Sequence, residues 1–415
     1  MLKNILKNWL KFLATRVLNK YKPRVVAITG STGKTTVKDA IFEVLKEQNK
    51  EGRAIVAKTQ GNLNTEFGVP INIIDFTFIG SNKDTQGRTA LTKKEVWDIT
   101  LQALRLIILR KEYPKIIILE LGLEHPGDIG YFMEFIKPEV GVLTNIGDVH
   151  LEFFDNKAAL VSEKRKLIEG IKKDGVAILN AEDQFTKMVA KSTLAKKVLI
   201  GFSKIADYRA SSLGVSNSGI HFMVNSKKGT AEVNMPVFGQ QFVYPALTAI
   251  AVANHFGVAL SVAAKRLANF KLPPGRFEKM NFGNFVLIDD TYNANPDSMA
   301  AALDSLARIG GGKRKVAILG DMRELGPVYK SAHVQIGKLA SEVVDLLIVI
   351  GEGGEIIGES ALESGLAQKQ VIVANTDNFR DVIFSYLKDN DIVLVKGSRA
   401  VNMEEVIKVI KRKFN

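Results

Sequence analysis

Short apolar runs alternate with helix-forming stretches along most of the chain, and this alternation restricts its fold more than any other feature. The pattern is typical of βαβ units, whose strands pair in parallel. One series of runs starts after Arg24 and a second starts after Leu272-Pro273-Pro274-Gly275, so we expect two α/β domains hinged near Pro274. The expected strands are Val25–Thr29, Ile116–Glu120, Val140–Thr144 and Val176–Leu179, then Phe285–Ile288, Val316–Leu319, Leu346–Ile350, Val371–Ala374 and Ile392–Val395.

Residues 200–236 depart from this pattern. Apolar and polar residues alternate there with a period of two, as in Gly219–Val224. Such alternation is typical of antiparallel strands with one exposed face. We expect an antiparallel edge here rather than a further βαβ unit.

The composition excludes several kinds of site and partner. The 415 residues suffice for about two to four domains. The chain has no cysteine, which excludes disulfides, thiolate metal sites and a cysteine nucleophile. Its formal net charge of +13 attracts anions such as nucleotides, phosphorylated substrates or an acidic membrane surface. Because no basic stripe is interleaved with aromatic residues and no zinc-finger spacing occurs, we expect no nucleic-acid partner.

Residues 1–22 form a separate feature, an amphipathic basic helix. The lysines interrupt it too often for a membrane-spanning helix, and no small-residue cleavage site follows, as a signal peptide would need. Two placements stay open: the helix docks on the domain that follows, or it lies on an anionic membrane face. The apolar residues at helical spacing are Leu2, Ile5, Leu6, Trp9, Leu10, Leu13, Val17 and Leu18, and the basic residues are Lys3, Lys7, Lys11, Arg16 and Lys20.

The segment Ile28–Thr36 reads Ile-Thr-Gly-Ser-Thr-Gly-Lys-Thr-Thr and lies between an expected strand and an expected helix. In this context a glycine loop wraps phosphates with its backbone N–H groups. Lys34 would place a positive charge near the transferring phosphate, and the Thr35 hydroxyl would be a magnesium ligand. The common loop has a glycine where this chain has Ile28, so this is a variant loop.

Two further candidates stand beyond expected strands. Glu120 places a carboxylate at the carboxyl edge of a parallel strand, where such sheets bind ligands, and we expect it to hold magnesium directly or from the second coordination sphere. His150 follows another expected strand and is one of five histidines. By itself it is more typical of a buried structural histidine.

Several motifs occur in a fixed order: Thr29-Gly-Ser-Thr-Gly-Lys-Thr-Thr36, Gly61-Asn-Leu-Asn-Thr65, Glu120-Leu-Gly122, Thr144-Asn-Ile146 with His150, Pro274-Gly-Arg276, Asp289-Asp-Thr-Tyr-Asn-Ala-Asn-Pro296 and Lys396-Gly-Ser-Arg399. In order and separation they resemble the Mur ligase family from about Arg24 to the C-terminus. The likeness is closest to the branch that adds D-alanyl-D-alanine to UDP-N-acetylmuramoyl-tripeptide. The segment beginning at Asp289 is the most specific of these motifs.

The resemblance implies both a fold and a reaction. The fold is α/β, with a central P-loop ATPase-like domain of mostly parallel sheet over residues 23–272 and a Rossmann-like C-terminal domain over residues 273–415. In this family ATP phosphorylates the carboxylate of the acceptor, and an incoming amine attacks the acyl-phosphate to give an amide, ADP and phosphate. The implied partners are small peptide and amino-acid substrates. The implied cofactors are ATP and two magnesium ions, which offset charge repulsion.

The resemblance also assigns residues. Thr35 and Glu120 would hold the first magnesium ion, and His150 would help hold the second. The family uses a carbamylated lysine as a further carboxylate ligand, and Lys164 falls at that position, with Lys166 as the neighbouring alternative. Catalytic roles are implied for Lys34, Glu120, His150 and Lys164; nucleotide contacts for Gly30, Ser31, Thr32, Gly33, Lys34, Thr35, Thr36, Arg276, Asp290, Asn293 and Asn295; acceptor contacts for Asn62, Asn64 and Thr65; and contacts to the incoming amine for Lys396, Ser398 and Arg399.

The sequence departs from the family pattern in two places. Ordinary members carry an N-terminal domain that binds the UDP-sugar, whereas here the phosphate loop starts near residue 29 and leaves room only for the amphipathic helix. A UDP-linked acceptor, a lipid-linked or otherwise anchored acceptor, and a partner protein in place of that domain all stay open. In the adenine-contacting segment, Gln241 and Pro245 replace the usual His and Asn, so recognition of the base must differ.

Three hypotheses of function follow. The leading one is an ATP-dependent amide-forming ligase that adds an amino acid or dipeptide, D-alanyl-D-alanine foremost, to a cell-wall precursor peptide. The second keeps this chemistry with a different, non-UDP acceptor. The third is a non-catalytic nucleotide-binding scaffold of an envelope complex, against which the retention of Lys34, Glu120, His150 and Lys164 argues. We expect a cytoplasmic protein, held at the inner face of the membrane if the first helix contacts lipid.

Overall fold

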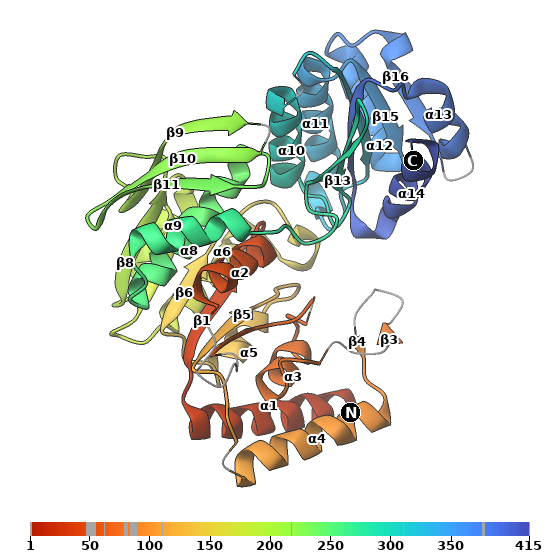
Figure 1. The fold of residues 1–415 in the computed structure, drawn as a ribbon. Coiled ribbons are helices and arrows are strands. Elements are labelled where there is room, and N and C mark those ends of the chain that lie inside the picture. Colours follow the sequence, from red (N-terminus) through yellow and green to blue (C-terminus); the bar gives the residue numbers. More distant parts are fainter. Residues whose placement is uncertain are drawn as a thin grey trace.

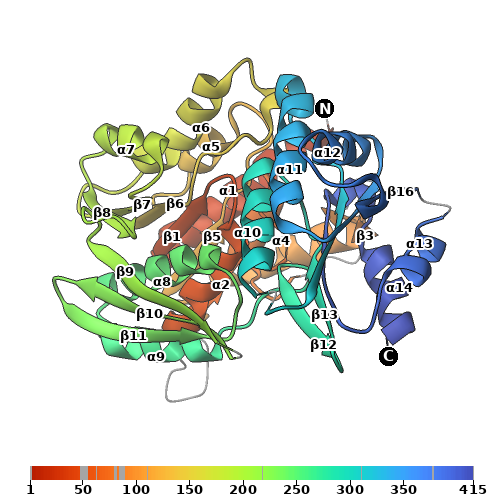
Figure 2. The same ribbon diagram turned by 90° about the horizontal axis from the view of Figure 1, so that it is seen from above.

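The computed structural model describes residues 2–46, 55–61, 63–78, 82–83, 89–109, 111–216, 218–309, 311–375 and 378–414. These residues form two lobes, each built on a sheet with helices packed against both faces (Figures 1 and 2). The last helix of the first lobe ends at Asn269, and the first strand of the second lobe begins at Glu278; the segment between them includes Arg276, which we count with the second lobe. None of the helices in these ranges is long and apolar enough to cross a membrane.

The first lobe contains a sheet in the order β11-β10-β9-β8-β7-β6-β1-β5-β2. The seven neighbouring strands β9-β8-β7-β6-β1-β5-β2 pair in parallel, while β10 pairs antiparallel with β9 and β11. This confirms the expected antiparallel edge. The bounds are β1 (Arg24–Thr29), β2 (Val56–Lys58), β5 (Ile116–Glu120), β6 (Val140–Leu143), β7 (Val176–Asn180), β8 (Lys196–Gly201), β9 (Tyr208–Ser216), β10 (Gly219–Ser226) and β11 (Gly229–Met235). A separate hairpin is formed by β3 (Asn82–Lys83) and β4 (Thr89–Ala90).

Strand β1 shows why this sheet is apolar on both faces. Val26 and Ile28 pack with helices α2 (Lys34–Leu45) and α8 (Val243–His255), whereas Val25 and Ala27 pack with helices on the opposite face. Successive side chains of a strand point to opposite faces, so a strand covered on both sides needs a continuous apolar run. The remaining helices of this lobe are α1 (Leu2–Tyr21), α3 (Gly68–Ile74), α4 (Lys93–Ile108), α5 (Asp128–Met133), α6 (Lys157–Glu169), α7 (Gln184–Val189) and α9 (Leu260–Arg266).

Helix α1 is docked on the first lobe. Leu10 and Leu13 are buried against α3 and α4, and Val17 joins the core beneath the sheet. The Lys20 ammonium donates to the carbonyl oxygens of Leu106 (2.8 Å) and Leu109 (2.6 Å), and so caps the carboxyl end of α4. The sequence left open whether this helix docks on the following domain or lies on a membrane. The structure shows that its inner face is docked.

The second lobe contains a sheet in the order β12-β13-β17-β14-β15-β16, parallel except for β12. The antiparallel edge strand β12 was not predicted. The strands are β12 (Glu278–Phe282), β13 (Phe285–Asp290), β14 (Arg314–Gly320), β15 (Leu346–Ile350), β16 (Val371–Ala374) and β17 (Asp391–Lys396), and the helices are α10 (Pro296–Ile309), α11 (Tyr329–Val343), α12 (Glu352–Glu363), α13 (Phe379–Tyr386) and α14 (Glu404–Phe414).

The two lobes share an apolar boundary. One buried cluster extends from α2 and α8 of the first lobe to α10 and α11 of the second, and the rings of Phe242 and Phe277 lie 6.2 Å apart within it. Figure 1 shows the second lobe beside the carboxyl ends of the central strands of the first. This arrangement turns the edge that carries the P-loop toward the second lobe.

Candidate active site

The P-loop lies at the carboxyl end of β1, between β5 and β6. Gly30 has φ 148°, and a Cβ atom at this position would collide with the Thr144 hydroxyl. Gly33 is the N-cap of α2 and is left-handed, with φ 77°. Both glycines are required by the backbone, because an L side chain would be strained at these positions.

Asn145, directly after β6, holds the loop in place. Its Oδ1 accepts hydrogen bonds from the backbone N–H (2.9 Å) and the hydroxyl (3.0 Å) of Thr32. The Thr144 hydroxyl donates to the Thr32 carbonyl at 2.7 Å. The sequence placed Thr144 and Asn145 in a motif without giving them a role; they are the residues that shape the loop.

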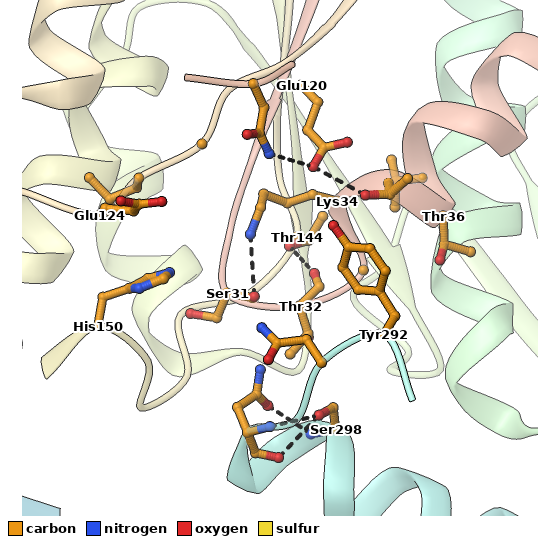
Figure 3. A pocket seen from close by; sticks show the side chains of 18 of the residues that line it. Ser31, Thr32, Lys34, Thr36, Glu120, Glu124, Thr144, His150, Tyr292 and Ser298 are labelled. Atoms are coloured by element: carbon orange, nitrogen blue, oxygen red, sulfur yellow. Dashed lines mark hydrogen bonds between the residues drawn. The ribbon is translucent and has the colours of Figure 1, made fainter. Parts of the chain in front are cut away.

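Lys34 folds over the loop that precedes it. Its ammonium donates to the Gly30 carbonyl at 2.8 Å and is directed toward Ser31, below Glu120 in the view of Figure 3. Removal from bulk water lowers the pKa of Lys34, although the Glu120 carboxylate favours the charged form. A cation in this position can approach a phosphate at the loop.

Glu120 is buried at the end of β5 and gathers donors from several elements. Its Oε1 accepts from the Thr35 hydroxyl (3.1 Å) and the Asn64 amide (3.0 Å), and its Oε2 lies 3.1 Å from the Lys38 ammonium. Burial alone would raise the pKa of Glu120, but Lys38, Lys34 and Arg276 outweigh burial and hold this pKa below its ordinary value. Glu120 is therefore ionised in the folded protein.

Lys164 on α6 is completely buried and points at the P-loop. Its amine donates to the Ser31 hydroxyl at 2.7 Å. Burial, followed by repulsion from Lys34, lowers the pKa of Lys164 well below the ordinary lysine value. The neighbouring Lys166 instead pairs with Glu163 at 2.6 Å and is 41% exposed. Of the two lysines that the sequence left open, only Lys164 faces the site.

The second lobe contributes Arg276 and the segment that follows β13. The Arg276 guanidinium donates to the Thr35 hydroxyl at 2.9 Å and lies 3.8 Å from the centre of the Tyr292 ring. Asn295 accepts from the Ser298 backbone N–H at 2.9 Å and so caps α10. Tyr292 received no role from the sequence, although its motif was recognised.

Lys396 and Ser398 belong to this same cluster. The buried Lys396 ammonium donates to Asp290 Oδ2 at 2.6 Å and to the Asn293 carbonyl at 2.9 Å. The Ser398 hydroxyl donates to Asn293 Oδ1 at 3.2 Å. Burial raises the pKa of Asp290, and the charge of Lys396 opposes this effect. Lys396, expected at the incoming amine, is thus engaged with the residues expected at the nucleotide, whereas the Arg399 side chain is 49% exposed.

The acceptor candidates lie beside Glu120. The Asn64 carbonyl accepts from the Gly122 N–H at 2.7 Å, and the Thr65 hydroxyl accepts from the Gly68 N–H at 3.3 Å, near the start of α3. Asn62 lies outside the described residues. His150 reaches the second lobe, where its Nδ1 lies 2.6 Å from Glu324 Oε2.

One cavity of about 1700 Å³ lies between the two lobes, and Lys34, Glu120, His150, Arg276 and Lys396 are among the residues that line it. Lys164 lies behind Ser31, which belongs to the lining. The lining also includes Gln241 and Pro245, where the sequence departs from the family pattern. Gln241 Oε1 accepts from the Ser305 hydroxyl at 2.8 Å, so this side chain is tied to the second lobe. The cavity exceeds the roughly 300–1000 Å³ of typical single-ligand sites and can hold more than one substrate.

The donor set at the P-loop fits magnesium. Among the described residues, no three His, Asp or Glu side chains gather as a ready-made metal site. The Thr35 hydroxyl and Glu120 carboxylate are adjacent, however, and Glu120 Oε2 is buried and makes no hydrogen bond, facing Lys38 as an ion pair. Magnesium commonly binds through one or two protein carboxylates and completes its shell with phosphate oxygens and water.

Comparison with known proteins identifies the family. Residues 28–253 match the family described as "Mur ligase middle domain", and residues 275–399 match "Mur ligase, glutamate ligase domain". The chain belongs to the Mur ligase family. A relative from Haemophilus influenzae, UDP-N-acetylmuramoyl-tripeptide--D-alanyl-D-alanine ligase, is 31% identical over 97% of this chain and 80% of its own length.

Solved Mur ligases have the same architecture. MurF from Acinetobacter baumannii superposes with a TM-score of 0.78 at 26% identity, covering 98% of this chain and 80% of its own. MurF from Thermotoga maritima in complex with ADP gives 0.78 at 25% identity, covering 98% and 84%. The predicted α/β fold and the predicted enzyme class, an ATP-dependent carbon–nitrogen ligase, are confirmed.

The buried pair of Lys38 and Glu120 leads to a stability prediction. Only 2% of the Lys38 side chain and 4% of the Glu120 side chain are exposed, so removing either charge leaves the other buried without its partner. Glu120→Gln and Lys38→Met should therefore each destabilise the protein by about 3–5 kcal/mol. The double variant should recover much of this loss. Chemical unfolding of the four proteins measures the coupling, and single-variant losses that simply add would contradict it.

The sign of the pH dependence follows from the lowered pKa of Glu120. The stability that Glu120 contributes should be fully present above the pKa of the unfolded carboxyl group, about 4.3. It should be lost as the pH falls through the lower pKa of the folded protein. The difference in the free energy of unfolding between wild type and Glu120→Gln should therefore decrease only at acidic pH. Chemical unfolding at several pH values measures it.

Proposed function

We propose that this chain joins an amino acid or dipeptide, D-alanyl-D-alanine foremost, to the carboxylate of a cell-wall precursor peptide. The observation that carries the proposal is the convergence of residues from both lobes on one cavity, with Arg276 of the second lobe bonded to Thr35 of the P-loop. The named relatives support the substrates. We also propose that residues 23–272 and 273–415 act as two domains whose closure completes the site.

The reaction proceeds in two steps. An acceptor carboxylate oxygen attacks the γ-phosphorus of ATP, the bond to the β-phosphate oxygen breaks, and an acyl-phosphate and ADP form. The incoming amine then attacks the acyl carbon, the acyl–oxygen bond breaks to release phosphate, and the amine loses a proton. Lys34 and Arg276 place fixed positive charge where two anions must meet, and this electrostatic positioning accounts for most catalysis of phosphoryl transfer.

Two magnesium ions would serve this site and neutralise phosphate charge. Thr35 and Glu120 would hold the first ion. His150, with a carboxylate carried by Lys164, would hold the second. Gly30, Ser31, Thr32, Gly33 and Thr36 would surround the phosphates, with Asp290, Asn293 and Asn295 shaping the second-lobe side. Asn62, Asn64 and Thr65 would contact the acceptor, and Ser398 and Arg399 the incoming amine.

Carbamylation of Lys164 is supported by its surroundings. Carbon dioxide reacts with a neutral amine, and burial beside Lys34 keeps this amine neutral at a lower pH than an ordinary lysine. The product is an anion, which would reverse the repulsion from Lys34 into attraction. The exposed, paired Lys166 has neither property.

We propose further that the outer face of α1 and α4 rests on an anionic membrane. The two tryptophans of the chain, Trp9 and Trp97, are both exposed on this face, 40% and 63% respectively. Trp9 donates from its ring nitrogen to Thr100 at 3.2 Å, which joins the two helices. Exposed Ile5, Phe12, Leu104 and Ile108 complete an apolar face, and Figure 1 shows both helices at one end of the molecule.

The net positive charge of helix α1 supports an anionic bilayer as the occupant of this face. Helix α1 contains five basic residues and no acidic residue. Tryptophans flanked by lysines and arginines are typical of proteins bound at the headgroup level. Lys3 and Leu6 of the same helix also line the cavity, so the membrane would lie beside its mouth. Such a position suits an anchored, non-UDP acceptor, the second hypothesis derived from the sequence.

Phosphate release tests the ligase activity. With ATP, magnesium, UDP-muramoyl-tripeptide and D-alanyl-D-alanine, purified protein should release phosphate only when both substrates are present. Lys34→Ala should reduce the rate of phosphate release by about a thousandfold, which is the effect expected of one cation that contacts the transferring phosphoryl group. Lys46 is exposed, and the control variant Lys46→Ala should keep the wild-type rate. ATP binding without ligation of these or other acceptors and amines would favour the scaffold hypothesis instead.

Carbon-13 NMR tests the modified lysine. Protein supplied with ¹³C-bicarbonate should show one carbamate signal that persists in Lys166→Ala and disappears in Lys164→Ala. Short carboxylic acids should partly restore the activity of Lys164→Ala by supplying the missing carboxylate. A signal that survives in Lys164→Ala would assign the modification elsewhere.

Tryptophan fluorescence tests the membrane contact, because both tryptophans report on this face. Anionic vesicles should shift the emission to shorter wavelength and sediment the protein, neutral vesicles should not, and high salt should weaken the effect. The variant Trp97→Ser with Ile108→Ser should bind about tenfold more weakly. Leu194→Ser, at an 83% exposed leucine on another surface, should bind normally. Absence of binding to anionic vesicles would make a protein partner the better occupant.

A further inference from the structure

His150 and Glu324 meet across the boundary between the lobes in an unusual backbone conformation. Both are left-handed, with φ 58° and 63°, which non-glycine residues rarely adopt. His150 precedes the short helix η1 (Leu151–Phe153), and Glu324 precedes η5 (Gly326–Val328). The Nδ1 atom of His150 lies 2.6 Å from Oε2 of Glu324 and is buried, although the ring N–H is not aligned for a hydrogen bond.

The boundary around this pair is closely packed. A Cβ atom on Gly326 would lie 3.1 Å from the backbone of Glu152, so only glycine allows this approach without displacing a neighbour. Val328 of the second lobe packs against the core cluster that contains Leu151 and Phe154 of the first. The contact between His150 and Glu324 thus lies within a closely packed interface between the two lobes.

The loop that carries Glu324 is fixed on either side. Asp321 accepts from the backbone N–H groups of Gly353 (2.7 Å) and Gly354 (3.2 Å), and the Met322 N–H donates to buried His333 at 2.9 Å. Leu325, the next residue along, is 1% exposed. With both flanks anchored, the position of Glu324 is determined by the second lobe before it meets His150.

We infer that Glu324 is a positioning residue for His150 and makes its use as a metal ligand depend on closure of the two lobes. This inference rests on the proposed role of His150. A carboxylate beside Nδ1 retains the proton on that nitrogen, leaves the Nε2 lone pair free, and makes the ring a stronger ligand. In an open arrangement the second lobe withdraws Glu324, and His150 loses the carboxylate that orients its ring.

The consequence is an ordered site. Thr35 and Glu120, the proposed holders of the first ion, both belong to the first lobe and are hydrogen-bonded to each other. The ion at His150 would bind fully only after the second lobe has closed. Phosphoryl transfer to the acceptor would thereby be restricted to the closed state, and this restriction would limit the hydrolysis of ATP by water.

Manganese binding, followed by electron paramagnetic resonance with a non-hydrolysable ATP analogue, tests this inference without turnover. In Glu324→Ala the second Mn²⁺ should bind about 10- to 100-fold more weakly, while the first binds as in wild type. Glu324→Gln keeps the shape and an acceptor oxygen, so it should show a smaller loss in the same direction. The control is Glu363→Ala, which removes an exposed carboxylate at the end of α12. This variant should leave both affinities unchanged.

The outcomes separate the inference from the function on which it rests. Loss of the second ion in His150→Ala together with unchanged affinity in both Glu324 variants would overturn the positioning role. Unchanged affinity in His150→Ala would instead overturn the proposed metal role of His150. If Glu324→Ala does not fold, Glu324→Gln decides, and an affinity equal to wild type in that variant overturns the inference.

Discussion

The buried carboxylate of Glu120 connects the parts of the protein that must act together. Its oxygens contact Thr35 of the P-loop, Asn64 of the segment before α3 and Lys38 of α2, and the field of Arg276 reaches it from the second lobe. A buried charge is stable only when several donors converge on it. The same requirement that stabilises this charge therefore fixes the relative positions of strand, loop and helix at the reaction centre.

The second lobe completes this centre through a few directed contacts. Arg276 meets Thr35, Glu324 meets His150, and the Asn145 amide lies 3.5 Å from Asp297. Each contact joins a polar group of one lobe to the other beside a shared apolar boundary. Such a boundary supplies most of the attraction, while the polar pairs determine which residues face one another. The closure that we propose would therefore also assemble the site.

The strands and the phosphate loop were predictable because their signals are local. Ile116–Glu120 and Leu346–Ile350 are buried strands within the bounds that the apolar runs gave. The edge strand β12 was missed, since Glu278–Phe282 mixes polar and apolar residues and is only partly buried. Lys396 was expected at the incoming amine, but its ammonium is held by Asp290 and Asn293, a contact between positions about a hundred residues apart that no local pattern reveals.

The sequence by itself determined the layered α/β architecture, the P-loop and the family, because strand periodicity, glycine conformation and motif order are properties of short segments. Only the tertiary structure shows that Lys164 rather than Lys166 contacts the P-loop, that the inner face of α1 is docked, and that Glu324 lies beside His150. These outcomes depend on burial and on pairing between distant segments. Two neighbouring lysines look alike in sequence, and packing alone places one amine in the core and the other in water.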